Sequence, residues 1–208
     1  MKKNTTKTGH IPKPKPAQPS NALNLEFHPL TSERWQDLEA LFGPRGACGG
    51  CWCMFWRVSR SQFDKQKGEG NRKALKKIVD SDEIPGILAY TNEGKPLAWC
   101  SVAPRENYPV LERSRVLKRI DEKPVWSVVC FFVAKSHRGR GVTVPLLKAA
   151  VNYAKNHGAK VVEGYPTESE KPMPASFIWT GLTSMFLKAG FVEVARGSET
   201  RPIMRCFV

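Results

Sequence analysis

A basic glycine loop is the part of the sequence whose residue types point most directly to chemistry. It reads Arg138-Gly139-Arg140-Gly141-Val142-Thr143 and lies between an apolar strand expected at 125–133 and a helix expected to end at Gly158. The first N–H groups of a helix lack partners within the helix, and the helix dipole is positive at that end. The sequence therefore predicts that an anion binds where the strand ends and the helix begins.

Two common phosphate-binding motifs are excluded for this loop. No Gly-Lys-Ser/Thr follows the glycines, so it is not a Walker loop. The spacing G-x-G-x-x-G is absent, and no acidic residue ends the strand expected at 160–165 at the distance found in dinucleotide-binding folds. A Gly/Arg string can also be a solvated loop or a nucleic-acid-binding segment, but the flanking strand and amphipathic helix favour an anion site.

A second candidate is the segment 43–57, which is rich in glycine, cysteine and aromatic residues. Cys48, Cys51 and Cys53 bring three thiols close together, but zinc needs four ligands and no fourth Cys or His lies nearby in the sequence. We therefore expect no metal. The aromatic residues could form the wall of a substrate pocket, or could only pack a helix at 32–42 against a sheet: they are Trp52, Phe55 and Trp56.

The order of elements predicts the α/β class, with one mixed sheet in a single domain over 23–208. The strand at 125–133, the helix after the loop and the strand at 160–165 imply a parallel pair with a right-handed crossover. A hairpin precedes this crossover, so the fold is not doubly wound. The other elements are expected as strands at 23–28, 86–91, 96–102, 191–195 and 202–208, and as helices at 32–42, 71–80, within 105–120, and at 180–189.

The composition is that of a globular protein with an excess of positive charge. The 208 residues carry a formal net charge of +14, of which the five lysines of a Lys/Pro-rich segment, 1–22, contribute +5. We expect that segment to be disordered. The charge suits a phosphorylated cofactor or a nucleic acid, or only a soluble basic surface. A chain of this size needs no disulfides and has no apolar run of membrane-spanning length, so we expect a cytoplasmic location.

On these motifs the chain resembles the GCN5-related N-acetyltransferase (GNAT) superfamily. The family signature, Arg/Gln-x-x-Gly-x-Gly/Ala after an apolar strand, matches 138–143 except that Thr143 replaces Gly or Ala. The run MFLKAGF at 185–191 is similar to the closing-helix motif of the family. The resemblance covers about residues 23–208, where two motifs lie at the right separation.

The resemblance implies a fold and a cofactor. The strands at 125–133 and 160–165 would splay apart, and acetyl-CoA would lie in the opening, with no metal. The backbone of Phe131, Phe132 and Val133 would pair with the pantetheine arm. The pyrophosphate would be held by the backbone of the glycine loop, that is, by Arg138, Gly139, Arg140, Gly141, Val142, Thr143 and Val144.

The resemblance also implies catalytic positions, and one of them departs from the family. The tyrosine that often protonates the departing thiolate aligns with Phe186, which has no proton to give. Ser184, Tyr165 or water could take its place. Glu163 is the leading candidate for the base, because it is the acid within an otherwise apolar central strand; the alternative is a structural ion pair. We expect Phe186→Tyr to leave the fold intact.

The expected activity is transfer of an acetyl group from acetyl-CoA to a primary amine of a small molecule or peptide. The expected partners are acetyl-CoA, the amine acceptor and a second copy of the chain in a homodimer, without a membrane. Two alternatives stay open. Phe186 suggests a CoA-binding protein without transferase activity, and the net charge suggests a protein that binds nucleic acid, a partner we expect only in that case.

Overall fold

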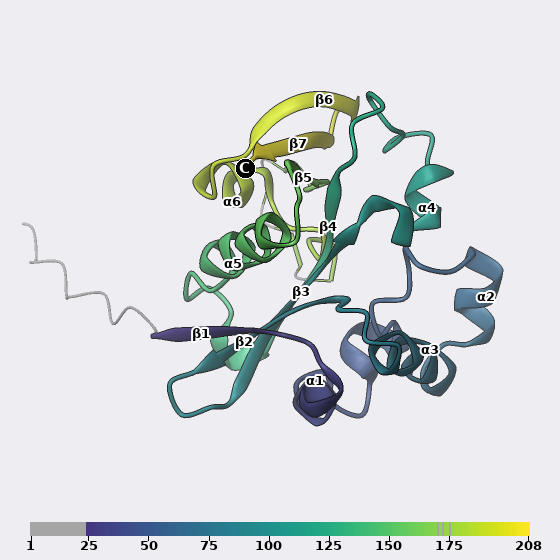
Figure 1. Ribbon diagram of the computed structural model, residues 1–208, viewed down its shortest axis with the longest axis vertical. Coiled ribbons are helices and arrows are strands. Elements are labelled where there is room, and N and C mark those ends of the chain that lie inside the picture. The colour runs from purple at the N-terminus through teal and green to yellow at the C-terminus, as the bar shows by residue number, and fades with distance from the viewer. Residues whose placement is uncertain (1–23, 170, 172, 175) are drawn as a thin grey trace, which may run out of the picture.

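The computed structural model describes residues 24–169, 171, 173–174 and 176–208. Seven strands form one mixed sheet in the order β1-β2-β3-β4-β5-β7-β6 (Figure 1). The strands are β1 (Leu25–Pro29), β2 (Gly86–Thr91), β3 (Pro96–Pro104), β4 (Trp126–Val133), β5 (Val161–Gly164), β6 (Val192–Ser198) and β7 (Arg201–Phe207). The helices are α1 (Trp35–Phe42), α2 (Arg60–Lys65), α3 (Glu69–Asp80), α4 (Pro109–Glu112), α5 (Thr143–Asn156) and α6 (Thr183–Lys188), with short turns of helix η1 (Ser32–Arg34), η2 (Gly46–Gly50), η3 (Arg105–Asn107) and η4 (Lys135–His137).

The sheet separates two hydrophobic cores, because the side chains of a strand alternate between its faces. On β2, Ile87 and Ala89 belong to the core under α5, whereas Leu88 and Tyr90 belong to the core shared with α1. Figure 1 shows α5 on one side of the sheet and α1 on the other, with α3 beside α1. The strand therefore reads as a continuous apolar run, as a strand covered on both faces should.

The two central parallel strands pair over only a short stretch. β4 and β5 are in register from Trp126 opposite Val162 to Val128 opposite Gly164. β4 then continues to Val133 alongside β3 alone, since β5 ends at Gly164. The strands thus separate beyond this point, as the family resemblance implied, and the open side of β4 is left for other contacts.

The sequence located nearly every element, and the structure confirms the single crossover and the mixed sheet. The helix α2 was not expected, because its six residues have no apolar stripe beyond Phe63. In the segment 43–57 the backbone has positive φ at Ala47, Trp52 and Cys53, which explains why that segment shows no regular period. The expectation of disorder for 1–22 lies outside the described residues.

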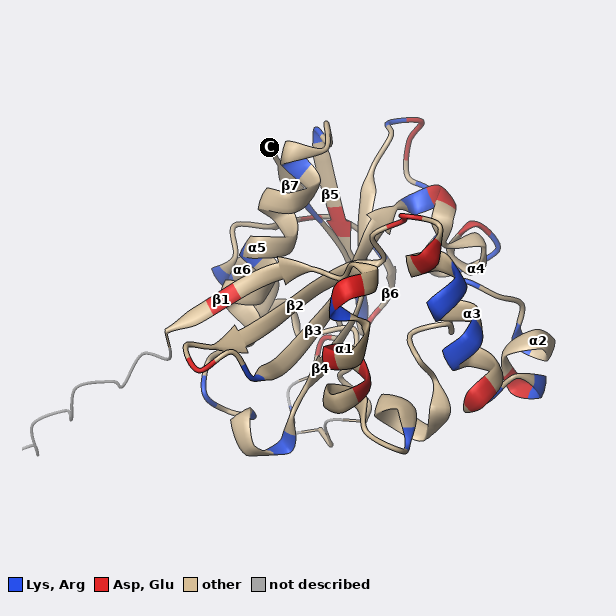
Figure 2. Cartoon of the chain, turned by 60° about the horizontal axis from the view of Figure 1, so that its bottom comes forward, with Lys and Arg blue, Asp and Glu red and all other residues tan. Residues whose placement is uncertain are grey.

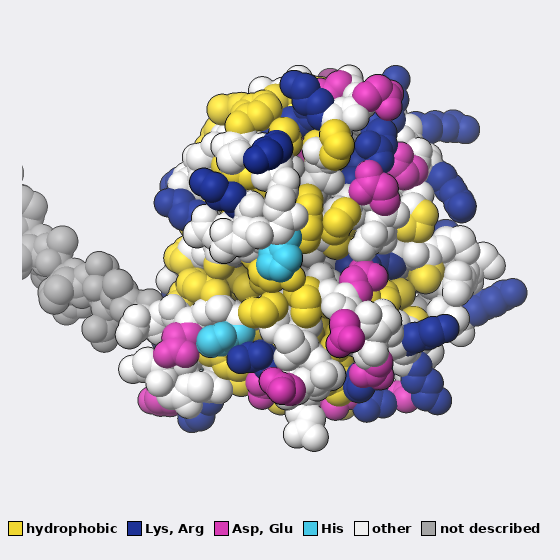
Figure 3. All heavy atoms as spheres, viewed as in Figure 1, with side chains coloured by type: hydrophobic (Ala, Val, Ile, Leu, Met, Phe, Trp, Pro, Cys, Tyr) yellow, Lys and Arg dark blue, Asp and Glu magenta, His cyan; other side chains and the backbone are white. Residues whose placement is uncertain are grey.

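Charged side chains of both signs are mixed over the surface. Figure 2 shows basic and acidic residues together on α3, and on the face seen in Figure 3 the Lys and Arg side chains project mostly from the periphery with acidic side chains among them.

The exposed apolar side chains include a group near the outer strand, namely Leu187, Val192, Val194 and Phe207. No helix in the described part of the chain is both long and apolar enough to span a membrane. The homodimer stays a prediction.

Candidate active site

A cavity of about 850 Å³ lies where β4 separates from β5. Eight of the ten residues predicted to contact a cofactor line it: Phe131, Phe132, Val133, Arg138, Gly139, Gly141, Val142 and Thr143. Arg140 is exposed at the rim and Val144 packs into the core under α5. The cavity therefore joins the glycine loop to the free side of β4, and the role of these residues in binding stays a prediction.

The glycine loop presents a row of free backbone donors. Gly139 and Gly141 have φ of 72° and 76°, a conformation that glycine adopts without a steric penalty. In the described part of the chain, the six successive N–H groups from Gly139 to Val144 donate no hydrogen bond to the protein. Val142 precedes α5 without a side-chain cap, and the first turn of the helix holds no acidic residue. This arrangement fits an anion that carries several oxygen acceptors, such as a pyrophosphate.

Part of the free side of β4 is already occupied by the protein. Phe132 pairs with β3, so the backbone N–H groups of Phe131 and Val133 point to the other side. The Phe131 N–H donates to the carbonyl of Trp179 at 2.6 Å, and the Arg138 Nε donates to the carbonyl of Val133 at 3.0 Å. The expectation that Phe131 pairs with a pantetheine arm is therefore not met through its N–H, whereas the Val133 N–H faces the open side.

The aromatic segment divides between the cavity and the core. Phe55 and Trp56 line the cavity, and their role as the wall of a substrate pocket stays a prediction. Trp52 does not line it, because its ring lies 6.0 Å from Trp35 and 5.4 Å from Phe42, both on α1. For Trp52 the structure thus shows the packing alternative, in which the segment holds α1 against the sheet.

Four thiols line the same cavity, namely those of Cys48, Cys51, Cys53 and Cys130. Cys130 comes from β4, and its Sγ lies 3.4 Å from that of Cys53. The hydrogen bond to Cys130 and burial raise the pKa of Cys53 well above its usual range, so this thiol stays protonated at neutral pH. Among the described residues, no group of three or more His, Cys, Asp or Glu could hold a metal ion.

Glu163 lies in a buried ion network and does not line the cavity. Its Oε1 accepts from Arg105 Nη1 at 2.9 Å, and its Oε2 accepts from Arg205 Nε at 2.7 Å. Both oxygens are therefore held by guanidinium groups, while Arg205 also forms a two-pronged pair with Asp121 and lowers the pKa of that carboxyl to about 2. This geometry favours the structural ion pair over the role of a base.

The two residues proposed to replace the family tyrosine do not reach the cavity either. The Tyr165 hydroxyl donates to Glu163 Oε1 at 2.7 Å and accepts from Arg105 Nη1 at 2.6 Å. Burial raises the pKa of Tyr165 well above its usual range, which keeps its proton in place. Ser184 is exposed on α6 and is not part of the cavity lining. Neither residue is therefore part of the lining, although Leu182 and Met185, near Ser184 in the chain, are.

Phe186 sits in the core behind the cavity, so Phe186→Tyr carries a stability cost that the sequence did not indicate, although the expectation that the fold stays intact remains a prediction. Its ring is fully buried and packs at 6.1 Å from Phe131 and 5.0 Å from Phe191. A hydroxyl there would be buried without a partner, so we expect Phe186→Tyr to cost about 2 kcal/mol, or about 4–8 °C in Tm, by thermal unfolding. Phe177→Tyr is the matched control, because Phe177 is 63% exposed. An unchanged Tm for Phe186→Tyr would place the new hydroxyl in the cavity.

Sequence reasoning missed several residues of the lining. Trp179 and Ile178 come from the Pro-rich stretch that follows β5, where nothing in the local pattern indicates a site. Phe63 comes from the unexpected helix α2. His137, directly before the glycine loop, also lines the cavity; it is half-buried, with Nδ1 3.0 Å from Ser136 Oγ. Contacts between such distant segments carry no sequence signal short of the fold itself.

Comparison with known proteins decides the family. The model of the Acetyltransferase (GNAT) family matches residues 52–172, more than half of the chain. The chain belongs to the GNAT acetyltransferase family. The matched region of this GNAT protein includes β4, the glycine loop and α5, so it covers the side of the cavity that the glycine loop lines. Among curated proteins, none matches the sequence of this GNAT protein.

Solved structures of low identity share the fold of this GNAT protein. The PaiA N-acetyltransferase of Thermoplasma acidophilum, solved in complex with coenzyme A, has a TM-score of 0.51 at 13% identity, covering 89% of this chain and 100% of that one. A GNAT acetyltransferase of Listeria monocytogenes has a TM-score of 0.57 at 8% identity, covering 91% and 98%. Arylalkylamine N-acetyltransferase 2 of Aedes aegypti has a TM-score of 0.53 at 12% identity, covering 88% and 99%. These likenesses show the GNAT fold.

Proposed function

We propose that the protein transfers an acetyl group from acetyl-CoA to a primary amine. The observation that supports this most directly is that one cavity of about 850 Å³ is lined both by four residues of the free N–H row, Gly139 and 141–143, and by a group of aromatic side chains. A structural neighbour of the same fold was solved with coenzyme A. An enzyme that holds two reactants in one cavity can accelerate their reaction by positioning alone.

Residues at one end of the cavity would bind the cofactor, and residues at the other end would bind the amine. The N–H groups from Gly139 to Val144, with Arg138 beside them, would hold the phosphates of the cofactor. Acetyl-CoA supplies an acetyl group already activated as a thioester. The Val133 N–H on the open side of β4 is the free donor for polar groups of the bound acyl carrier. The aromatic end excludes water from the place where the amine would lie.

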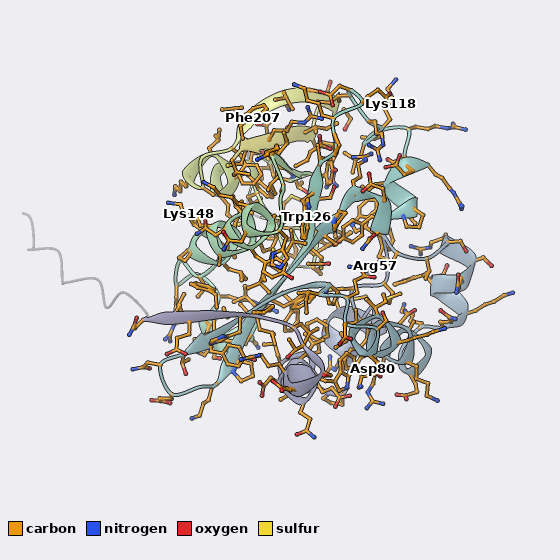
Figure 4. The ribbon with its side chains drawn as sticks, in the orientation of Figure 1. Arg57, Asp80, Lys118, Trp126, Lys148 and Phe207 are labelled. Carbon is orange, nitrogen blue, oxygen red and sulfur yellow. The ribbon has the colours of Figure 1, made fainter. Side chains whose placement is uncertain are left out.

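A titration calorimetry experiment with acetyl-CoA tests the proposal. Arg138→Glu should weaken binding by about tenfold or more, because it replaces a favourable charge with a repulsive one beside the phosphates. Lys148→Glu is the matched control, since it makes the same charge change on an exposed part of α5 (Figure 4) outside the cavity lining. No heat of binding with the unaltered protein, or an equal loss in both variants, would contradict the proposal.

A CoA-binding protein without transferase activity is the second candidate. It is favoured by the finding that Glu163, Tyr165 and Ser184 all lie outside the cavity lining. Release of free CoA thiol in the presence of an amine panel separates the two functions. Binding of acetyl-CoA without release for any amine would establish the second candidate.

A further inference from the structure

We infer that the acceptor is a monoamine whose amino group is carried on a flat, apolar body such as an aromatic ring, and that the aromatic end of the cavity selects it. This inference rests on the proposed function, because it names the substrate class of the same cavity. It follows from the shape, position and charge of one group of side chains, the aromatic wall, defined as Phe55, Trp56, Phe63 and Trp179.

The aromatic wall is a set of interlocking rings from three separate segments. The Phe55 ring stands edge-on to Trp56 at 5.1 Å, to Phe63 at 5.6 Å and to Trp179 at 5.3 Å. Trp56 and Trp179 are 5.9 Å apart at an interplanar angle of 38°. Phe55 and Trp179 are only half-buried, so they present ring surface to the cavity. Offset and edge-on contacts with such rings favour a flat aromatic ligand over a flexible polar one.

The aromatic wall is fixed directly beside the strand that faces the cofactor side. The carbonyl of Trp179 accepts the Phe131 N–H at 2.6 Å, and Phe131 and Val133 on β4 line the same cavity. A ligand whose ring lies on Trp179 therefore has its substituent within reach of β4. This places an amine on a short arm where the acyl group would be presented.

The charge of the lining disfavours an acceptor with a second positive charge. Within the described residues, no Asp or Glu lines the cavity, and Arg138 is the lining residue that carries a permanent charge. The guanidinium of Arg60 covers the Phe55 ring at 5.6 Å and the Phe63 ring at 5.8 Å. Arg60 is itself paired with Asp64 at 3.0 Å, so that acid is not free to neutralise a ligand. A polyamine or a lysine-rich peptide would have to bury a further cation against a lining that holds Arg138 and no acidic side chain, which is unfavourable.

The same apolar surroundings prepare the amine for reaction. Burial in a site of low dielectric constant favours the neutral form of an amine, which is the nucleophilic form. An acceptor held by the aromatic wall would therefore bind as the neutral amine, after giving one proton to solvent water. When the C–N bond forms and the C–S bond of the thioester breaks, a second proton passes from the nitrogen to the departing CoA thiolate, so no buried carboxylate is needed as base. This accounts for a cavity in which Glu163 takes no part.

The test compares tryptamine with spermidine as acceptors and as ligands. We expect kcat/KM for tryptamine to exceed that for spermidine by at least about 100-fold. Trp179→Ala should raise KM for tryptamine by about tenfold while leaving the dissociation constant of acetyl-CoA unchanged. Trp126→Ala is the matched control, because Trp126 (Figure 4) is also half-buried but packs on Tyr153 at 6.0 Å, outside this cavity.

Calorimetric binding of each amine without acetyl-CoA separates this inference from the proposed function. Tryptamine that binds the unaltered protein but not Trp179→Ala, without any release of CoA thiol, supports the aromatic wall as an amine site and rejects the transferase. Preference for spermidine, either in turnover or in binding, overturns the inference. So does a Trp179→Ala variant, folded by circular dichroism, that binds and acetylates tryptamine as well as the unaltered protein.

Discussion

Glu163→Gln is expected to destabilise the protein by about 3 kcal/mol, or about 6–12 °C in Tm, without changing the affinity for acetyl-CoA. The change keeps the shape of the side chain but removes the negative charge between two buried guanidinium groups. Arg105 is fully buried and Arg205 is 4% exposed, so neither can recover its hydration where it stands. Removing one partner of a buried ion pair leaves an uncompensated charge, and this is why the effect is large.

The expected loss lies near the lower end of what breaking a buried pair can cost, because each arginine keeps another acidic partner. Arg105 Nε donates to Glu112 Oε1 at 2.8 Å, and both terminal nitrogens of Arg205 contact Asp121. The outer nitrogen of Arg105 also has a hydrogen-bond acceptor, since Nη2 donates to the carbonyl of Leu117 at 2.7 Å. Glu163 is thus one of several acids, but it is the one that bridges the two arginines.

Thermal unfolding and acetyl-CoA titration of the same preparation check this prediction. Glu93→Gln is the matched control, because Glu93 is exposed in the β2–β3 turn and its contact with Lys95 is 3.4 Å long. Its effect should stay within about 0.5 kcal/mol, as for other surface ion pairs. If Glu163 were the base, Glu163→Gln would keep its Tm and abolish amine-dependent release of CoA thiol. That outcome would contradict the structural role assigned here.

For Glu163, the sequence could predict burial but not the partners of the carboxylate. Its position in an apolar strand was visible, and a buried carboxylate was the correct deduction. Its partners were not visible, because Arg105 and Arg205 are separated from it by 58 and 42 residues and come from η3 and β7. A chain read without its fold cannot say which arginine neutralises a buried acid, so the base and the ion pair remained equal alternatives.

The glycine loop was predictable for the opposite reason. Its function depends on neighbours in the chain: an apolar strand before it, two glycines with positive φ and the first turn of α5 after it. The aromatic wall depends on tertiary contacts instead, since Trp179 meets Phe55 only because the segment after β5 folds back onto β4. A binding loop made of neighbouring residues can therefore be predicted from the sequence. The cavity lining that distant segments contribute can be identified only from the structure.

Gly164→Ala is expected to cost about 3 kcal/mol, the upper part of the range for overpacked cores. A Cβ added to Gly164 would lie 2.0 Å from Phe186 Cε1 and 2.7 Å from Cζ. The opposite edge of the ring already lies close to the Gly181 backbone, since even a Cβ added there would be only 2.8 Å from Phe186 Cε2, so the ring has little room to shift. Phe186 is therefore wedged between two glycines, and the space that each leaves is needed for the ring.

The stability lost in Gly164→Ala should come from the steric clash with Phe186, and Gly158→Ala is the control that tests this. Gly158 has φ of 87° with nothing within 4 Å of an added Cβ, so Gly158→Ala should cost only the strain of its backbone, about 1 kcal/mol. In a double-mutant cycle measured by chemical denaturation, Phe186→Leu should relieve part of the loss caused by Gly164→Ala, with a coupling of about 1 kcal/mol or more. Additive effects would show that the two residues do not press on one another.

This contact also links the core to the cavity. Gly164 is the residue at which β5 leaves β4, and Phe186 packs on Phe131, which lines the cavity from β4. A displaced Phe186 would push on Phe131 and Gly181, both of which line the cavity. Gly164→Ala should therefore weaken acetyl-CoA binding as well as the fold, whereas Glu163→Gln, one residue away but facing the ion network, should affect the fold alone.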